Sequence, residues 1–158
     1  MYHEPSDYLC PFCSWLVGHE TNEKRNSDIV YQNETLTAFI APKWWANNPG
    51  HVIVIPNNHS ENIYCIDDET LASISVLCKH IAIAMRTSYN CTGISTRQHN
   101  EPDGGQSVWH FHTHVFPRYP NDHLYQNHDD KQFVSPAERE VYAKQLRKAL
   151  KDYVVSGS

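Results

Sequence analysis

Residues 107–116 are Ser107-Val108-Trp109-His110-Phe111-His112-Thr113-His114-Val115-Phe116, a run in which histidine returns at every second position. Such alternation predicts a β-strand, because successive side chains of a strand point to opposite faces. We therefore expect this run to form a strand that ends at Pro117 and carries all three histidines on one face. The opposite face is mostly apolar and suited to packing on a core.

Three imidazoles on one face of a strand have three interpretations. Alternate histidines can bind zinc, or one imidazole can attack phosphorus while neighbouring groups hold its tautomer and the departing oxygen. A purely structural cluster is costly, since a buried neutral imidazole needs partners for both ring nitrogens and charged rings repel one another. The preceding loop, Gly104-Gly105-Gln106, favours phosphorus chemistry, because glycines let the backbone approach a ligand and the amides that follow can hold phosphate oxygens.

The rest of the sequence predicts an α+β domain. Segments rich in β-branched and aromatic residues predict strands, and apolar side chains at helical spacing predict two longer helices. We expect an antiparallel sheet of about five strands with these two main helices. The expected elements are a hairpin over 29–32 and 35–40, a loop over 41–50, strands over 51–55 and 93–97, a helix from Asp67, an irregular segment over 119–131, and a helix over about 135–152 that a capping box begins.

Length and composition exclude several classes of protein. The chain has 158 residues, enough for one domain, and its net charge of −5 and scattered basic residues argue against a nucleic-acid partner. No apolar stretch approaches the roughly 20 residues of a membrane span, and the N-terminus does not resemble an export signal. Five cysteines are an odd number, so we expect reduced thiols in the cytoplasm, with Cys65, Cys78 and Cys91 as small buried residues.

The first two cysteines have the spacing of a metal-binding motif. Cys10-Pro11-Phe12-Cys13 is a C-x2-C sequence, as in zinc knuckles, where two thiolates need two further ligands. A reduced pair without metal is the alternative. A thioredoxin-like role is not expected, because the βαβ context around Cys10 is missing.

The histidine run and the loop before it resemble a known family. The run from His110 to Phe116 is similar to the His-φ-His-φ-His-φ-φ motif of the histidine-triad (HIT) nucleotide hydrolases and transferases, with Thr113 only weakly apolar. Pro117-Arg118 resembles the dinucleoside polyphosphate hydrolase branch more than the phosphoramidase branch. The resemblance covers about residues 8–120. It implies a single HIT-like domain over residues 1–158 and a homodimer whose two sheets are continuous.

The resemblance also implies roles for individual residues. His112 would attack the α-phosphorus of a nucleotide, and water would then hydrolyse the nucleotidyl-histidine to release a nucleoside monophosphate. His114 would contact the phosphate or the departing oxygen, and His51 would support these rings from behind. Phosphate or leaving-group contacts would come from Asn100, Gly105, Gln106, Ser107 and Val108.

A subset of the family resembles the cysteine pattern as well. This implies that His59 and His110 complete a structural zinc site with Cys10 and Cys13. One departure concerns the ribose: Ala41 stands where the family commonly has Asp or Asn. Lys43 or Asn47 would then take over the ribose hydroxyls, and Trp44 and Trp45 would either stack on a base or pack internally.

The expected function is that of a hydrolase that splits dinucleoside polyphosphates or related nucleotide conjugates. A nucleoside phosphoramidase would use the same nucleophile with another leaving group. A non-catalytic nucleotide-binding module held together by zinc, and a catalytic zinc bound by all three triad histidines, are the other interpretations. A nucleotidyltransferase is disfavoured, because that branch resembles His-Pro-His and this chain has Thr113.

Overall fold

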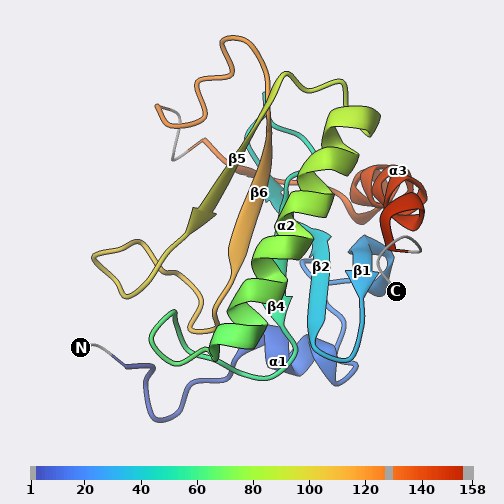
Figure 1. The fold of residues 1–158 in the computed structure, drawn as a ribbon. Coiled ribbons are helices and arrows are strands. Elements are labelled where there is room, and N and C mark those ends of the chain that lie inside the picture. Colours follow the sequence, from blue (N-terminus) through green and yellow to red (C-terminus); the bar gives the residue numbers. More distant parts are fainter. Residues whose placement is uncertain (1–2, 127–129, 155–158) are drawn as a thin grey trace.

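The structure, a computed structural model, describes residues 3–126 and 130–154. Its main feature is a five-stranded antiparallel sheet in the order β1-β2-β4-β6-β5 (Figure 1). The fold class expected from the sequence is thereby confirmed. The strands are β1 (Ile29–Gln32), β2 (Leu36–Ile40), β4 (Val52–Pro56), β6 (Thr113–Arg118) and β5 (Gly93–Gln98).

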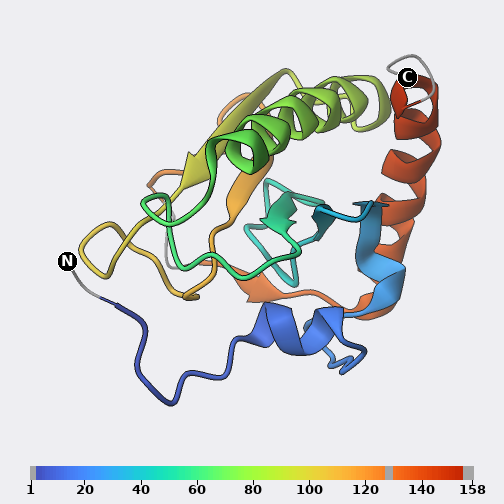
Figure 2. The same cartoon turned by 60° about the horizontal axis from the view of Figure 1, so that its bottom comes forward.

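Two helices lie on opposite sides of this sheet (Figure 2). The long helix α2 (Asp68–Ser88) covers one face, and the short helix α1 (Pro11–Leu16) lies on the other. Asp67 caps α2, because its side chain accepts a hydrogen bond from the Thr70 amide at 2.8 Å. The face toward α1 is only partly covered, and this is where the pocket described below lies.

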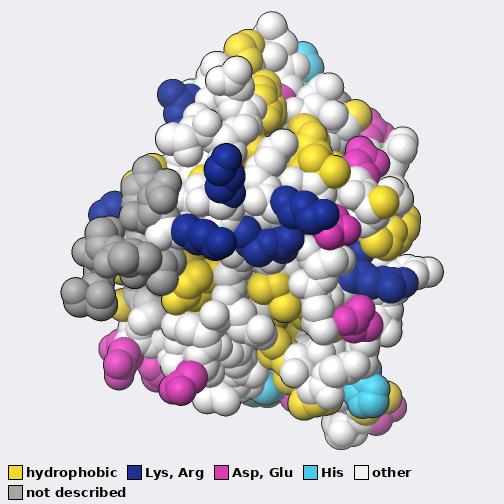
Figure 3. Space-filling model, turned by 90° about the vertical axis from the view of Figure 1, so that its right-hand side faces the viewer, with side chains coloured by type: hydrophobic (Ala, Val, Ile, Leu, Met, Phe, Trp, Pro, Cys, Tyr) yellow, Lys and Arg dark blue, Asp and Glu magenta, His cyan; other side chains and the backbone are white. Residues whose placement is uncertain are grey.

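The C-terminal helix α3 (Pro136–Val154) packs beside β1 and β2 and against α2. Ser135 caps it through the Glu138 amide, as the capping box predicted. A fully buried, bidentate ion pair fixes α3 to the 3-10 turn η1 (Asn26–Asp28): Arg139 donates to both carboxylate oxygens of Asp28, at 3.0 and 2.9 Å. On the face that includes α3, Lys and Arg side chains gather among acidic ones (Figure 3).

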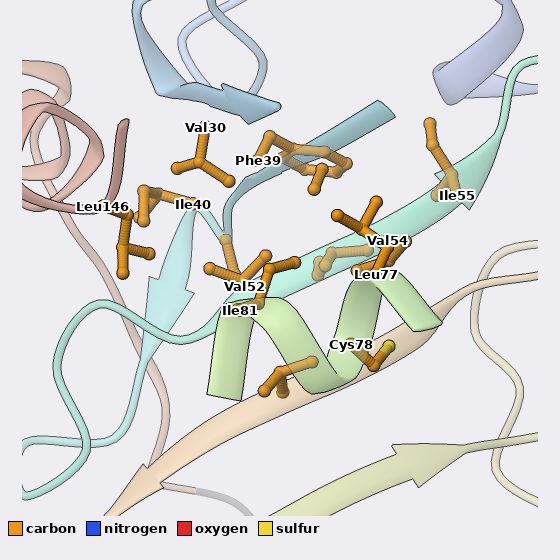
Figure 4. Packing of buried hydrophobic residues seen from close by; sticks show 14 of the residues in the cluster. Val30, Phe39, Ile40, Val52, Val54, Ile55, Leu77, Cys78, Ile81 and Leu146 are labelled. Carbon is orange, nitrogen blue, oxygen red and sulfur yellow. The ribbon is translucent and has the colours of Figure 1, made fainter. Parts of the chain in front are cut away.

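The core lies between the sheet and the helices. Leu77 and Ile81 of α2 meet Val52 and Val54 of β4 (Figure 4). Opposite residues of paired strands share a face, so Phe39, Ile53 and His114, which are in register, point to the other side. All residues of β4 are buried, because this strand lies at the centre of the sheet, between β2 and β6.

The expected strand over 107–116 is wrong in its first half. The β6 strand begins only at Thr113, which lies opposite Val54 of β4 and opposite Gln98, the last residue of β5, so the chain before Thr113 runs outside both ladders. The amide of Phe111 instead bonds the carbonyl of Ser60 at 2.6 Å. The strand also runs past Pro117 to Arg118: the Pro117 carbonyl bonds the Asn48 side chain on the side away from β5, so the missing N–H removes no bond to β5.

Two smaller expectations were also wrong. The segment 41–50 is not all loop, since β3 (Lys43–Trp44) pairs with β7 (Gln132–Phe133) in a second, two-stranded sheet. Cys65 is exposed rather than buried, whereas Cys78 and Cys91 are buried. Across residues 3–126 and 130–154, the structure has no helix with both the length and the apolar character needed to cross a membrane.

Candidate active site and metal cluster

A pocket of about 320 Å³ opens on the sheet face opposite α2. One end is apolar, with Phe12 of α1 against Phe39 of β2 at 5.7 Å between ring centroids. The other end is formed by Trp45 and Phe116, whose rings lie 5.6 Å apart. The rings of His112 and His114, 5.1 Å apart, line the pocket as well.

His112 is held in one tautomer by its own backbone neighbourhood. Its Nδ1 lies 2.7 Å from the carbonyl oxygen of His110, and a carbonyl can only accept, so Nδ1 carries the proton. Burial lowers the pKa of His112, although the His110 carbonyl opposes that shift. The ring is therefore neutral near pH 7, with its lone pair on Nε2, which is the state a nucleophile needs.

His114 is paired with a second buried histidine. Its Nδ1 lies 3.3 Å from Nε2 of His51, which is only 2% exposed. Burial lowers the pKa of His51 to about 3, and burial together with His51 lowers the pKa of His114. Nδ1 of His51 makes no hydrogen bond to the described residues. An unpaired N–H in a buried position costs more than an unpaired lone pair, so we assign the proton of His51 to Nε2 and the lone pair to Nδ1. His51 then donates to His114, which keeps its own proton on Nε2, the nitrogen left for a ligand.

The loop before the triad approaches His112 with its backbone. Gly105, Ser107 and Val108 line the pocket. Gln106 does not line it: its Nε2 donates to the carbonyls of Glu61 and Val108, and its Oε1 accepts from the Glu101 amide. The side chain of Gln106 therefore shapes the loop from within.

Asn100 is likewise outside the pocket wall. Its side chain bonds that of Gln98 in both directions and accepts from the Ile63 amide. Gly104 packs on the Asn100 carbonyl so closely that a Cβ at Gly104 would overlap it. A glycine is therefore needed at position 104 so that the backbone can pack against Asn100 within the same loop, rather than against a ligand.

Cations surround the pocket. Lys24, Lys43, Arg97 and Lys131 line it, with Glu23 as its acidic member. Glu23 lies 3.3 Å from Lys43 and is thus paired. Lys24 lies over the ring of Phe12 at 5.6 Å, and burial lowers its pKa. The pocket thus suits an anionic ligand with an apolar part.

Beside the pocket, two cysteines and two histidines converge as expected. The ligand atoms of Cys10, Cys13, His59 and His110 all lie within 4.8 Å of one another. The Sγ–Nδ1 distance is 3.3 Å for Cys10 to His110 and also for Cys13 to His59. A tetrahedral ion bound by sulfur at about 2.3 Å and nitrogen at about 2.0 Å separates such atoms by about 3.5 Å, so the cluster fits a metal.

The far nitrogens of both histidines strengthen that fit. Nε2 of His110 lies 2.9 Å from the carbonyl of Pro56, and Nε2 of His59 lies 3.0 Å from a carboxylate oxygen of Glu4. Both acceptors place the proton on Nε2 and leave the Nδ1 lone pair directed at the sulfurs. Burial lowers the pKa of His110 to about 4, and burial together with the neighbouring Cys10 raises the pKa of the Cys13 thiol to about 12.

The expected site residues thus separate into three groups. His51, His112, His114, Gly105, Ser107 and Val108 line the pocket, Gln106 and Asn100 support its loop, and His110 belongs to the cysteine cluster. Ala41, Lys43 and Trp45 also line the pocket, whereas Trp44 packs on Tyr142 at 5.0 Å. Asn47 turns elsewhere, toward the Asp122 carbonyl.

Sequence reasoning missed other lining residues, among them Phe12, Lys24, Arg97, His99 and Lys131. Two of them had a usable signal: Arg97 lies on a predicted strand, opposite His114, and His99 lies directly before Asn100 in the segment that resembles the phosphate loop.

Comparison with known proteins identifies the family. Residues 22–121 match the HIT domain family. A Bacillus subtilis protein called Protein hit is 34% identical over 110 residues, which cover 70% of this chain and 71% of that protein. The chain therefore belongs to the HIT domain family.

Two further relatives are informative. The bis(5'-adenosyl)-triphosphatase of Dictyostelium discoideum is 26% identical over 118 residues, or 75% of this chain and 72% of that one. A zinc-bound histidine triad family protein from Mycobacterium smegmatis is 26% identical in its solved structure, with a TM-score of 0.72 over 93% of this chain and 96% of that one.

Proposed function

We propose that this protein hydrolyses dinucleoside polyphosphates or related nucleotide conjugates through a covalent nucleotidyl-histidine, with His112 as the nucleophile. The observation that carries this is the tautomer of His112: its Nδ1 proton is engaged by the His110 carbonyl, so Nε2 has a free lone pair in an anion-attracting pocket. Membership in a family that includes a dinucleoside triphosphatase supports the reaction class.

In the first step, Nε2 of His112 forms a bond to the α-phosphorus while the bond from phosphorus to the leaving oxygen breaks. The electron pair departs with that oxygen, which the Nε2–H of His114 stabilises. The amides of Ser107 and Val108 hold the non-bridging oxygens. Water then attacks the phosphorus and gives up a proton to the solvent, the electron pair of the breaking P–N bond returns to Nε2 of His112, and a nucleoside monophosphate is released.

The end of the pocket formed by Phe12 and Phe39 would take the nucleoside. Phe12 and Phe39 offer rings for a base, and Lys43 is the polar side chain beside Ala41 that can reach a ribose. Gln106 and Asn100 would act by keeping the phosphate loop in shape rather than by touching the phosphate.

The metal of the cysteine cluster would be zinc with a structural role. Two thiols and two Nδ1 atoms are a zinc-type donor set, and protein groups fill all four positions, which leaves none for substrate. A zinc-bound family member of similar fold supports this assignment. A catalytic zinc bound by all three triad histidines has no geometric support, because His110 faces the cysteines and His114 faces His51.

A direct test uses the nucleophile. His112→Asn should lower kcat on diadenosine tetraphosphate by at least about 10³-fold, a loss typical of a removed catalytic nucleophile, with an unchanged circular dichroism spectrum. His19→Asn, an exposed histidine away from the pocket, is the matched control and should keep wild-type kcat. Rapid acid quenching should trap adenylate on a peptide that contains His112. A His112→Asn protein with wild-type turnover would contradict the nucleophile assignment.

Cleavage of nucleoside phosphoramidates is the alternative reaction, because the same nucleophile can displace either an oxygen or a nitrogen leaving group. A nucleotide-binding module without turnover is the alternative outside enzymes, and tight binding of adenosine monophosphate with no hydrolysis would favour it. We also propose that the chain forms a single domain over residues 1–158, that it assembles as a homodimer with a continuous sheet, and that it is located in the cytoplasm.

A further inference from the structure

Arg97 is a pocket residue that the proposed chemistry does not yet use. It lies on β5 directly opposite His114 on β6, and opposite residues of an antiparallel pair share a face. This puts its side chain beside His114 and away from Phe12, at the Trp45–Phe116 end of the pocket. Any group that leaves the phosphorus on the far side from the nucleoside moves toward Arg97.

The guanidinium of Arg97 is held by aromatic rings. Its central carbon lies 4.9 Å from the ring centroid of Phe116, 4.6 Å from that of Tyr125 and 5.8 Å from that of Trp45. Such contacts fix the plane of the group, and a side-chain hydrogen bond to Tyr125 engages part of its N–H edge. Nη2 is buried and makes no hydrogen bond within the part of the chain that the structure describes. A buried, charged donor without an acceptor is costly, so we expect Nη2 to donate a hydrogen bond to a bound ligand.

Its neighbour Arg118 provides an internal contrast. Arg118 also contacts Tyr125, at 4.7 Å, but donates to both carboxylate oxygens of Asp122, at 2.6 and 2.8 Å. Among the described side chains of residues 3–126 and 130–151, no carboxylate pairs with Arg97 in that way. One arginine of this pair is thus neutralised by the protein, and the other keeps its charge for the pocket.

We propose that Arg97 binds the phosphate group directly beyond the scissile bond, on the leaving group, and so selects phosphoanhydride substrates over phosphoramidates. This rests on the proposed function. When the P–O bond breaks, the departing oxygen becomes a terminal oxygen of a phosphate whose negative charge grows beside the guanidinium. When a P–N bond breaks, the nitrogen takes up a proton and leaves as an amine, which gains nothing from a cation. Arg97 therefore discriminates between the two leaving groups.

The test compares two substrates in matched variants. Arg97→Gln should lower kcat/KM for diadenosine tetraphosphate by about 10- to 100-fold, the range of a lost charge-assisted hydrogen bond. For an adenosine N-alkyl phosphoramidate the change should stay within about threefold. Arg97→Lys keeps the charge without the planar donor edge and should fall between. Lys148→Gln, an exposed cation of α3, should change neither substrate. Equal losses on both substrates would overturn the proposal, because they would assign Arg97 only to packing behind His114.

A binding experiment separates this inference from the failure of the proposed function. In a His112→Asn background, which removes the nucleophile, isothermal titration calorimetry with ADP and AMP measures the contribution of the β-phosphate. ADP should bind about 10-fold more tightly than AMP, and adding Arg97→Gln should abolish that preference. The comparison stands even if wild-type protein hydrolyses no nucleotide. Equal affinities for ADP and AMP with Arg97 present would overturn the proposal.

Discussion

Nδ1 of His112 lies 2.7 Å from the carbonyl oxygen of His110, whose own ring belongs to the cysteine cluster. One residue thus connects the metal cluster to the proposed nucleophile: its Nδ1 faces the sulfurs, and its carbonyl fixes the His112 tautomer. A metal bound there would hold the His110 backbone in place and, through it, the lone pair of His112.

The first prediction concerns that tautomer. Imidazole ¹⁵N NMR at pH 7 should show His112 with a protonated Nδ1 and an unprotonated Nε2, because the carbonyl acceptor permits no other neutral form. The His112→Asn spectrum identifies the signals. A His112 ring protonated on Nε2 at this pH would contradict the nucleophile assignment.

The second prediction concerns the metal. Cys10→Ser/Cys13→Ser should reduce zinc, measured by plasma mass spectrometry, from about one ion per chain to none, since the cluster supplies four ligands to a single ion. The variant should also unfold at a lower temperature and have a lower kcat, because His110 loses its anchor. Cys65→Ser, an exposed thiol outside the cluster, is the control. Full zinc content in the double variant would place the ion elsewhere.

The third prediction concerns pH. Burial lowers the pKa of His51 to about 3, below its unfolded value of about 6.5, so the unfolded state binds more protons between these values. Stability from this residue is fully present above pH 6.5 and is lost as the pH falls toward 3, by at most about 1.4 kcal/mol per pH unit.

Urea unfolding of wild type and His51→Gln at pH 7.5, 6.5 and 5.5 isolates this effect, because both proteins keep the cysteine cluster. The free energy of unfolding of wild type should fall more steeply toward pH 5.5 than that of the variant. Parallel pH profiles would show that His51 is not buried in its neutral form.

The fourth prediction concerns the buried ion pair that fixes α3. Arg139→Met removes both bonds to Asp28 and leaves a carboxylate with no exposure, so the free energy of unfolding should fall by about 3–5 kcal/mol. Lys144→Met, at an exposed ion pair with Glu140 on the same helix, should change it by less than about 1 kcal/mol. Similar losses in the free energy of unfolding of the two variants would argue against a buried carboxylate at Asp28.

The fifth prediction concerns the phosphate loop. A Cβ at Gly104 would overlap the Asn100 carbonyl, so Gly104→Ala must displace the loop that carries Ser107 and Val108. We expect kcat/KM to fall at least about tenfold, as for small misplacements of catalytic groups. Gly93→Ala, at a glycine where a Cβ would make only an ordinary contact with Arg118 Cβ at 3.6 Å, is the steric control for activity. Unchanged kinetics in Gly104→Ala would show that this loop does not position substrate.

The sequence by itself determined the sheet-forming segments, the two long helices and the grouping of the triad with a glycine loop. These follow from local rules: alternation along strands, helical spacing of apolar residues, and capping by Asp67 and Ser135. Alternation failed at residues 107–112, because β5 ends at Gln98 opposite Thr113 and the amide of Phe111 bonds the Ser60 carbonyl instead of a strand.

Only the tertiary structure decided which partner each polar group has. Arg97 and Arg118 look alike in the sequence, yet Asp122 neutralises one and aromatic rings leave the other facing the pocket. Likewise, His110 and His112 are two positions apart but face a cysteine pair and a pocket. Such pairings depend on residues distant in the chain that the fold brings within a few ångströms, so no local pattern contains them.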